Sequence, residues 1–441
     1  MGRWRDPQKT HQHKRCVINA STGWRLEVLG LACMKLRPHS LVLGGLAGEI
    51  KGDGVNDDAS GIQALLDSGD GEINLPRPKK CYLIGETLRI HSNQTLRLDR
   101  SAILRLKPNA AKVMLSNASH ETGDENITVE GGIWDMDNLN QPLTEYQQTR
   151  KGKPFYEESY YAGILMRFNN VKNLRLASLT LKDPVTFGMQ LGRLRQFKIE
   201  DIVFDYNLKR SNMDGVHLNG DCRWGFIRNL MGATNDDLLA LNADDSGWAE
   251  MTRGPIEDIS AEGIFAENGY TAVRLLSAGS PIRRIKLSGI FGTYRVNVVS
   301  FTNHNVHPGA PSTFEDVTID GVFASKSGDG KQAPIWIASP AMIGSLTIRD
   351  YHRTETASPV SDILIDPLCQ IENLNISGFS SINTTPGGYF AIENRGTIGV
   401  LNIANMFVKS EGGVPGGMLL GGDGTVQKAN FPEETRRQSK K

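Results

Sequence analysis

The feature that most constrains the fold is a short apolar pattern that recurs from Val171 onward. One copy reads Ile282-x-x-Ile285-x-Leu287-x-Gly289, followed by another apolar residue. Nine copies begin at positions 171, 194, 222, 256, 282, 314, 343, 371 and 398, and a weaker copy lies near position 124. The copy at 222 is degenerate, because Gly225 stands at its second apolar position.

Each copy combines a short alternating stretch, which is typical of a strand, with a bend. The residue at the bend is always Gly, Asp, Asn or Ser, the types that tolerate a left-handed backbone. Helical repeats would need longer runs with a period of about 3.6 residues. Successive copies are 23 to 34 residues apart, which favours a solenoid in which each copy forms one rung. The predicted fold is all-β, a single-stranded right-handed parallel β-helix whose rungs bury their apolar faces by stacking.

The same reasoning predicts the boundaries of the chain's parts. A short helix at Asp58 to Ser68, with an apolar face, would cap the N-terminal end of the solenoid. We expect the β-helix to span residues 49–423. Residues 1–48 form an extension that is poorly ordered or leader-like in this interpretation, and residues 424–441 form a polar, basic tail.

Composition excludes several classes of function. Lysine plus arginine and aspartate plus glutamate are each 49, so the charge gives no reason to expect nucleic acid or an anionic membrane as partner. The five cysteines are odd in number, scattered and without metal-binding spacing, which argues against a disulfide framework or a zinc site. We expect no cofactor and no metal. No apolar run approaches the roughly 18 residues of a membrane span.

Three aspartates within residues 211–237 are the candidate active site. Asp214 is separated from Asp236 and Asp237 by 22 and 23 positions, close to the shorter interval of the repeat. Adjacent parallel strands lie about 4.7–4.9 Å apart, so these carboxylates would meet on neighbouring rungs. Adjacent residues of a strand face opposite sides of the sheet, so Asp236 and Asp237 can share a face only at a bend. The preceding residues, Thr234-Asn235, are suited to form one. The alternative is that they are solvated acids at rung turns.

Clustered carboxylates push their pKa values apart, so that one can act as an acid while another acts as a base. Inverting glycosidases use such a pair, about 6.5–9.5 Å apart, with a water molecule between the base and the sugar. Carboxylates on adjacent rungs would lie within several Å to about 10 Å of one another, a range that includes this separation.

The residues around these aspartates resemble a known family. Asn212-Met-Asp-Gly and Asn235-Asp-Asp are similar to the N-T-D-G and G-D-D motifs of the polygalacturonases, glycoside hydrolase family 28. The stretches VEGGIWDMDN, NLRLASLTLKDP and KGDGVNDDASGIQALL also resemble those of pectate-lyase-superfamily β-helices. The resemblance implies that Asp236 is the general acid and that Asp214 and Asp237 activate the attacking water. It also implies an extracellular or periplasmic protein that acts on a carbohydrate.

Two family positions differ. Gly269-Tyr270-Thr271 stands where the family has G-H-G, and Val299-Ser300-Phe301 stands where it has the R-I-K motif associated with the substrate's carboxylate. Asn235 also replaces the first glycine of G-D-D. The candidates for substrate binding are Asn212, His217, Asn235, Tyr270, Arg274 and His304.

A long insertion between Trp134 and Tyr161 carries several aromatic residues, Tyr146 among them. These aromatics suit either a wall of the substrate site or packing against the solenoid, and Trp224 and Trp248 carry the same two interpretations.

Three functions stay open. The first is an inverting glycoside hydrolase acting on a polysaccharide or oligosaccharide, pectin-like or another plant or microbial glycan. The second is a polysaccharide lyase, in which the aspartates would hold calcium and a basic residue would abstract a proton. The third is a non-catalytic glycan-binding β-helix, such as a tailspike or adhesin shaft.

Overall fold

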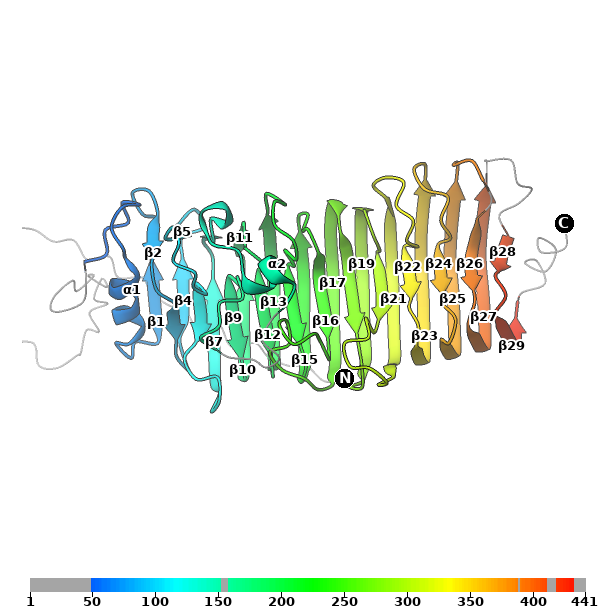
Figure 1. Ribbon diagram of the computed structural model, residues 1–441, viewed down its shortest axis with the longest axis horizontal. Helices are drawn as coiled ribbons and strands as arrows, with labels where there is room; N and C mark the ends of the chain where they lie inside the picture. Colours follow the sequence, from blue (N-terminus) through cyan, green and yellow to red (C-terminus); the bar gives the residue numbers. More distant parts are fainter. Residues whose placement is uncertain (1–48, 152–157, 388, 411–417, 432–441) are drawn as a thin grey trace, which may run out of the picture. The chain divides into compact units, whose positions relative to one another are not determined.

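The computed structural model describes residues 49–151, 158–387, 389–410 and 418–431, and these residues form a right-handed parallel β-helix (Figure 1). This confirms the predicted fold class. The predictions made for residues 1–48 lie outside the described residues. Among the residues described, no helix is long and apolar enough to cross a membrane.

The strands of the described chain form two sheets that run along the solenoid. The larger one, sheet A, contains β1 (Glu72–Leu75), β2 (Tyr82–Ile84), β4 (Thr95–Leu98), β5 (Ile103–Leu106), β7 (Asp124–Glu130), β8 (Ile133–Asp135), β10 (Val171–Ala177), β11 (Thr180–Lys182), β13 (Arg195–Asp205), β15 (Cys222–Met231), β17 (Ile256–Gly269), β19 (Ile282–Tyr294), β21 (Ser312–Lys326), β23 (Ala341–Glu355), β25 (Gln370–Asn383), β27 (Thr397–Ser410) and β29 (Thr425–Asn430).

Sheet B, the second sheet, contains the shorter strands β3 (Leu88–Ile90), β6 (Leu115–Asn117), β9 (Met166–Asn169), β12 (Met189–Gly192), β14 (Val216–Asn219), β16 (Asp237–Asn242), β18 (Thr271–Leu276), β20 (Val299–Thr302), β22 (Ile335–Ile337), β24 (Ile363–Ile365), β26 (Phe390–Asn394) and β28 (Met418–Gly421). The described helices are α1 (Ala59–Leu66), the 3-10 helix η1 (Asn138–Asn140) and α2 (Glu145–Thr149).

Each copy of the apolar pattern is one rung of sheet A. The first residues of successive copies pair in register, as Ile256 with Ile282 and Ile282 with Phe314 show. The residues predicted at the bends all have φ between 49° and 74°, which is the left-handed region: Ser178, Asp201, Asn229, Gly263, Gly289, Gly321, Asp350, Gly378 and Asn405. The bend turns the strand so that the apolar residue after it faces the core again.

The degenerate copy at Cys222 has a packing explanation. Gly225 pairs with Phe197 on the preceding rung, and a Cβ built on Gly225 would lie 2.2 Å from the Phe197 ring. Phe197 is itself buried in the core. The aromatic ring therefore fills the volume that the side chain at position 225 fills in the other rungs.

The two ends of the solenoid are closed differently. At the N-terminal end, α1 buries Ile62 and Leu66, as expected for a cap. At the C-terminal end, β29 pairs with β27 and continues the register of Ile398 with Val426. The β-helix thus extends past the boundary expected at residue 423. The physical reason is that the edge of β27 offers unpaired backbone groups, which a polar strand can satisfy as well as an apolar one.

Sheet B positions the candidate site. In β14, Val216 and Leu218 belong to the core, so His217 between them faces outward. The residues in register with His217 along the sheet form what we call the outer row: Arg89, Ser116, Arg167, Gln190, His217, Ala240, Arg274, Ser300, Trp336, Leu364 and Glu393.

Candidate functional site

The three aspartates lie where sheet B begins on two neighbouring rungs. Asp214 comes two residues before β14, and Asp237 is the first residue of β16. The backbone N–H of Gly215 donates to the Asp237 carbonyl (2.8 Å), which holds the two rungs together at this point. Asp236 lies in the bend before β16. The structure thus has the bend that the pair needs in order to share a face.

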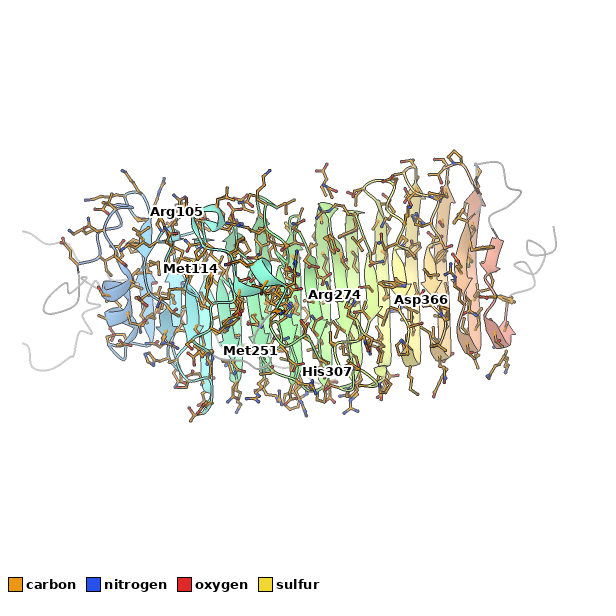
Figure 2. All side chains as sticks on the ribbon, in the orientation of Figure 1. Arg105, Met114, Met251, Arg274, His307 and Asp366 are labelled. Carbon is orange, nitrogen blue, oxygen red and sulfur yellow. The ribbon has the colours of Figure 1, made fainter. Side chains whose placement is uncertain are left out.

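Arg274, from the next rung, joins Asp236 and Asp237. Its Nη2 donates to Asp236 Oδ1 (2.8 Å) and forms an ion pair with Asp237 Oδ2. Asn212 Nδ2 donates to the other oxygen of Asp236 (3.3 Å). The side chains of Asp236 and Arg274 are 15% and 18% exposed, whereas that of Asp237 is fully buried. Arg274 lies midway along the β-helix (Figure 2).

His217 links Asp214 to a fourth carboxylate. Its Nδ1 lies 2.8 Å from Asp214 Oδ2, and its Nε2 lies 2.9 Å from Asp245 Oδ2. Asn242 Nδ2 also donates to Asp245 Oδ2 (2.8 Å). Asp245 was not a candidate in the sequence analysis. The available signal was its interval of 28 residues from His217, which lies within the range of the rung repeat.

Burial, neighbouring charges and hydrogen bonds together shift the pKa values of Asp214, His217 and Asp245. Burial raises the pKa of Asp214 to about 6, and the nearby charge of Asp236 adds to the rise, against the hydrogen bond from His217. Burial alone would lower the pKa of His217, but its hydrogen bonds to Asp214 and Asp245 outweigh burial and raise that pKa to about 9. The imidazolium in turn lowers the pKa of Asp245, although that carboxyl is buried.

Asp237 is the most strongly perturbed carboxyl of the site. Burial raises its pKa well above the usual range, and the positive charge of Arg274 compensates only in part. Neither of its oxygens has a hydrogen-bond partner of good geometry among the described residues, although Oδ2 contacts Arg274. An unsatisfied, buried carboxyl is costly for stability, and such groups gather at functional sites.

The remaining candidates surround this core. Asn235 Nδ2 donates to the Arg210 carbonyl (2.6 Å) and therefore fixes the bend that carries Asp236. Tyr270 lies under the guanidinium of Arg295, whose Cζ is 5.5 Å from the ring centroid. Burial and the charges of the two acids of the bend raise the pKa of Tyr270.

His304 lies in the loop after β20 and is exposed to solvent.

One aromatic residue of the insertion, Tyr146, forms a wall beside this site together with Phe187 and Trp248. Phe187 stacks on His217, with ring centroids 4.0 Å apart, and also contacts Trp248 at 5.6 Å. Tyr146, on α2, stacks on the other side of Trp248 at 3.9 Å. Trp224 lies on sheet A, where it is 55% exposed, and is not part of this wall.

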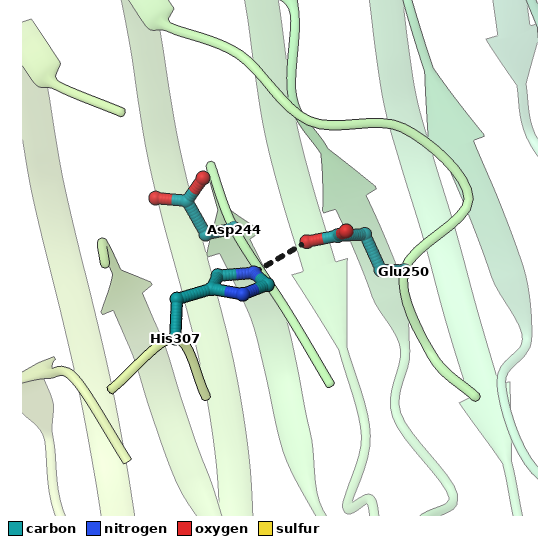
Figure 3. A group of neighbouring side chains, drawn as sticks. All are labelled: Asp244, Glu250 and His307. Atoms are coloured by element: carbon teal, nitrogen blue, oxygen red, sulfur yellow. Dashed lines mark hydrogen bonds and ion pairs between the residues drawn. The ribbon is translucent and has the colours of Figure 1, made fainter. Parts of the chain in front are cut away.

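A separate cluster could offer ligands to a metal ion. One atom each from Asp244, Glu250 and His307 lie within 4.8 Å of one another (Figure 3). The Arg253 side chain lies among them, with Nε 3.4 Å from both carboxylates and a contact to the His307 ring. Asp244 also accepts hydrogen bonds from the backbone of Ala278 and from Ser280. Arg253 is the cation of this network, which joins the loop after β16 to the loop after β20.

Comparison with known proteins identifies the fold. No family model and no curated protein sequence matches the chain. The structure is similar to the Yersinia enterocolitica family 28 exopolygalacturonase, with 14% identity over 82% of this chain and 76% of that one, at a TM-score of 0.51. It is also similar to the Aspergillus tubingensis endo-xylogalacturonan hydrolase, with 15% identity, coverage of 78% and 94%, and a TM-score of 0.56.

The resemblance to the family 28 β-helix is confirmed at the level of the fold. A third similar structure, pre-mature bacteriophage phi29 gene product 12, has 13% identity over 87% of this chain and 56% of that one, at a TM-score of 0.52. Similarity at such low identity reports architecture, and the same architecture carries different functions. Function must therefore be argued from the site.

Proposed function

We propose that this protein is an inverting glycoside hydrolase that acts on a polysaccharide or oligosaccharide outside the cytoplasm. The observation that carries the proposal is the contact of Asp214, Asp236 and Asp237 with His217 and Arg274 on the outer face of sheet B. Paired carboxylates with perturbed pKa values are what glycosidic hydrolysis requires.

Each carboxyl has a role that suits its surroundings. Asp236, whose side chain reaches solvent, would protonate the leaving oxygen as the glycosidic C–O bond breaks. Asp214, with a pKa raised to about 6, is ionised near neutral pH and would take a proton from the water whose oxygen bonds to the anomeric carbon. Asp237, whose pKa is raised further, would keep a proton beside Asp236 rather than act as a second base.

The lyase alternative is less well supported. A lyase needs a basic residue near the aspartates, and the structure has Arg274 in contact with Asp236 and Asp237. A lyase base must release its proton, and the charges of Asp237 and Asp236 raise the pKa of Arg274 instead. Arg274 is therefore a poor base in this setting.

A non-catalytic glycan-binding protein is the second candidate. The specific observation in its favour is that Arg274 lies between Asp236 and Asp237, where its positive charge offsets part of the charge of the two acids. The almost complete burial of Asp214 and Asp237 points the same way. Both features suit a binding surface as well as a reaction centre.

One experiment distinguishes these functions. A panel of plant and microbial glycans is incubated with the protein, and new reducing ends and double-bond absorbance are measured. The proposal expects reducing ends and an inverted anomeric configuration by NMR. Double-bond absorbance would indicate a lyase, and glycan binding without products would indicate a binder.

On the active substrate, Asp214→Asn and Asp236→Asn should each lower turnover by about 100- to 10,000-fold. Asp201→Asn, at a bend of sheet A, is the matched control and should retain wild-type activity. Normal turnover by the two site variants would refute the assignment.

A further inference from the structure

The exposure of the outer row changes abruptly at the candidate site. On the N-terminal side, Gln190 and His217 are each only 2% exposed although their side chains face away from the core. From Arg274 onward the exposure of the row is mixed: Arg274, Trp336 and Leu364 are partly exposed, whereas Ser300 between them is buried. The outer row is therefore buried on the rungs of Asp214 and Asp237 and partly exposed from the rung of Arg274 onward.

The cover is the aromatic wall together with α2. The side chain of Phe187 lies on His217, Trp248 lies against Phe187, and Tyr146 stacks on Trp248. Gln147, the next residue of α2, donates from Nε2 to the carbonyls of Val185 (2.9 Å) and Ser211 (3.2 Å). These contacts join α2 to the segment that leads to Asp214.

The loop that carries Trp248 is fixed at several points. Gln190 Nε2 donates to the Ala249 carbonyl (2.9 Å), and the Met251 N–H donates to Asn219 Oδ1 (3.1 Å). Glu250 accepts from the Asp245 N–H (2.8 Å), so this loop also holds the carboxylate that partners His217. The cover is consequently part of the framework of the site.

Farther toward the N-terminus, the outer-row residues Arg167 and Ser116 are also buried and Arg89 is partly exposed. A cavity of about 260 Å³ lies there, lined by the outer-row residues Arg89, Ser116 and Arg167 among others. Because the buried part of the row separates this cavity from the aspartates, the accessible surface is not continuous across the site.

On the C-terminal side, Trp336 offers an aromatic surface. It is two rungs beyond Arg274, which corresponds to about 9–10 Å along the solenoid. Its Nε1 donates to Asp366 Oδ2 (3.0 Å), which fixes the ring. A fixed, partly exposed aromatic ring at this distance can support a second or third sugar of a bound chain.

From this arrangement we infer that the substrate is bound by one of its ends. The terminal sugar lies against the Tyr146–Trp248 cover, the scissile bond lies at Asp236, and the rest of the glycan passes Trp336. The enzyme then cleaves near chain ends and releases short products of uniform size. This inference rests on the proposed hydrolase function, of which it specifies the mode of action.

The test uses the full chain and the polysaccharide on which reducing ends were detected. Wild-type protein should give one dominant short product from the first minutes, with little loss of viscosity. Trp248→Ala removes the middle of the cover and should give products of mixed size and a rapid loss of viscosity. Trp224→Ala, the same substitution on sheet A, should keep the wild-type product profile.

Trp336→Ala should raise KM about 3- to 10-fold for long oligosaccharides and leave the shortest cleaved substrate unaffected. Circular dichroism melting verifies that each variant is folded. Gln147→Ala loosens α2 without removing an aromatic ring, and it should also give products of mixed size. Mixed products from the wild-type protein would overturn the inference and leave hydrolysis standing. Absence of any hydrolysis across the panel would overturn both.

Discussion

Replacing His217 should change how stability depends on pH. The usual pKa of histidine is 6.5, and in the folded protein that of His217 is about 9, because Asp214 and Asp245 hold its protonated form. A group with a raised folded pKa stabilises fully below its unfolded pKa, and this contribution is lost as the pH rises through the folded pKa. The wild-type protein should therefore lose about 3 kcal/mol of stability between pH 6.5 and pH 9 from this group.

The range from pH 6.5 to pH 9 separates the titration of His217 from most of the titration of Asp214. Asp214, whose pKa is raised to about 6, is mostly ionised at pH 6.5 and contributes only a small further change. The assay is the free energy of unfolding from urea titrations across this pH range. His217→Gln should be less stable at pH 6.5, because two carboxylates lose their cation, and its curve should be flatter.

His352→Gln is the matched control. His352 is exposed on sheet A, where it stacks on Phe323, and this variant should keep the wild-type slope. Parallel curves for His217→Gln and the wild type would refute the reasoning, as would an NMR titration of the His217 ring with a midpoint near 6.5.

Three further predictions follow from the sequence and the structure. Gly225→Leu should destabilise the fold by about 1–3 kcal/mol in thermal melts, because Phe197 fills that space, and adding Phe197→Ala should recover part of the loss. If Asp214 is the base, kcat/KM should fall about tenfold per pH unit below about pH 6, and a flat acid limb would argue against it. Deletion of residues 1–40 should leave the melting temperature almost unchanged, because their sequence has no periodic apolar face, and a large drop would contradict this.

The fold was predictable because the constraints of a β-helix are local and repeated. Every rung needs an apolar residue at the same places and a residue that accepts positive φ at the bend, and both requirements can be seen in the sequence. Strand β29 could not be found in this way, because it pairs through its backbone and five of its six side chains, those of Thr425, Gln427, Lys428, Ala429 and Asn430, are exposed. The position of α2 could not be predicted either, because α2 lies in an insertion that does not follow the repeat.

The candidate site was predictable to the extent that it depends on the rung interval. The interval places Asp214 next to Asp237, and the bend before β16 turns Asp236 to the same side. Arg274 was a candidate for substrate binding, but its contact with two carboxylates depends on the rotamer of a long side chain, which no spacing encodes. Asp245 escaped notice because its partner is an imidazole on the previous rung rather than a neighbour in the repeat pattern.

The net charge of the whole site supports the roles proposed for its carboxyl groups. Asp214, Asp236, Asp237 and Asp245 are four carboxylates, and the cations in contact with them are His217 and Arg274. With all six groups ionised, the cluster would carry a charge of −2, most of it shielded from water. The least costly way to reduce that charge is to keep a proton on a carboxyl, and burial makes Asp237 the group that keeps it. A cluster that only stabilised the fold would gain nothing from an excess of buried carboxylates. A hydrolase needs one protonated and one ionised carboxyl at the same pH, and this excess lets the cluster hold a proton beside Asp236, the proposed acid, while Asp214 is ionised.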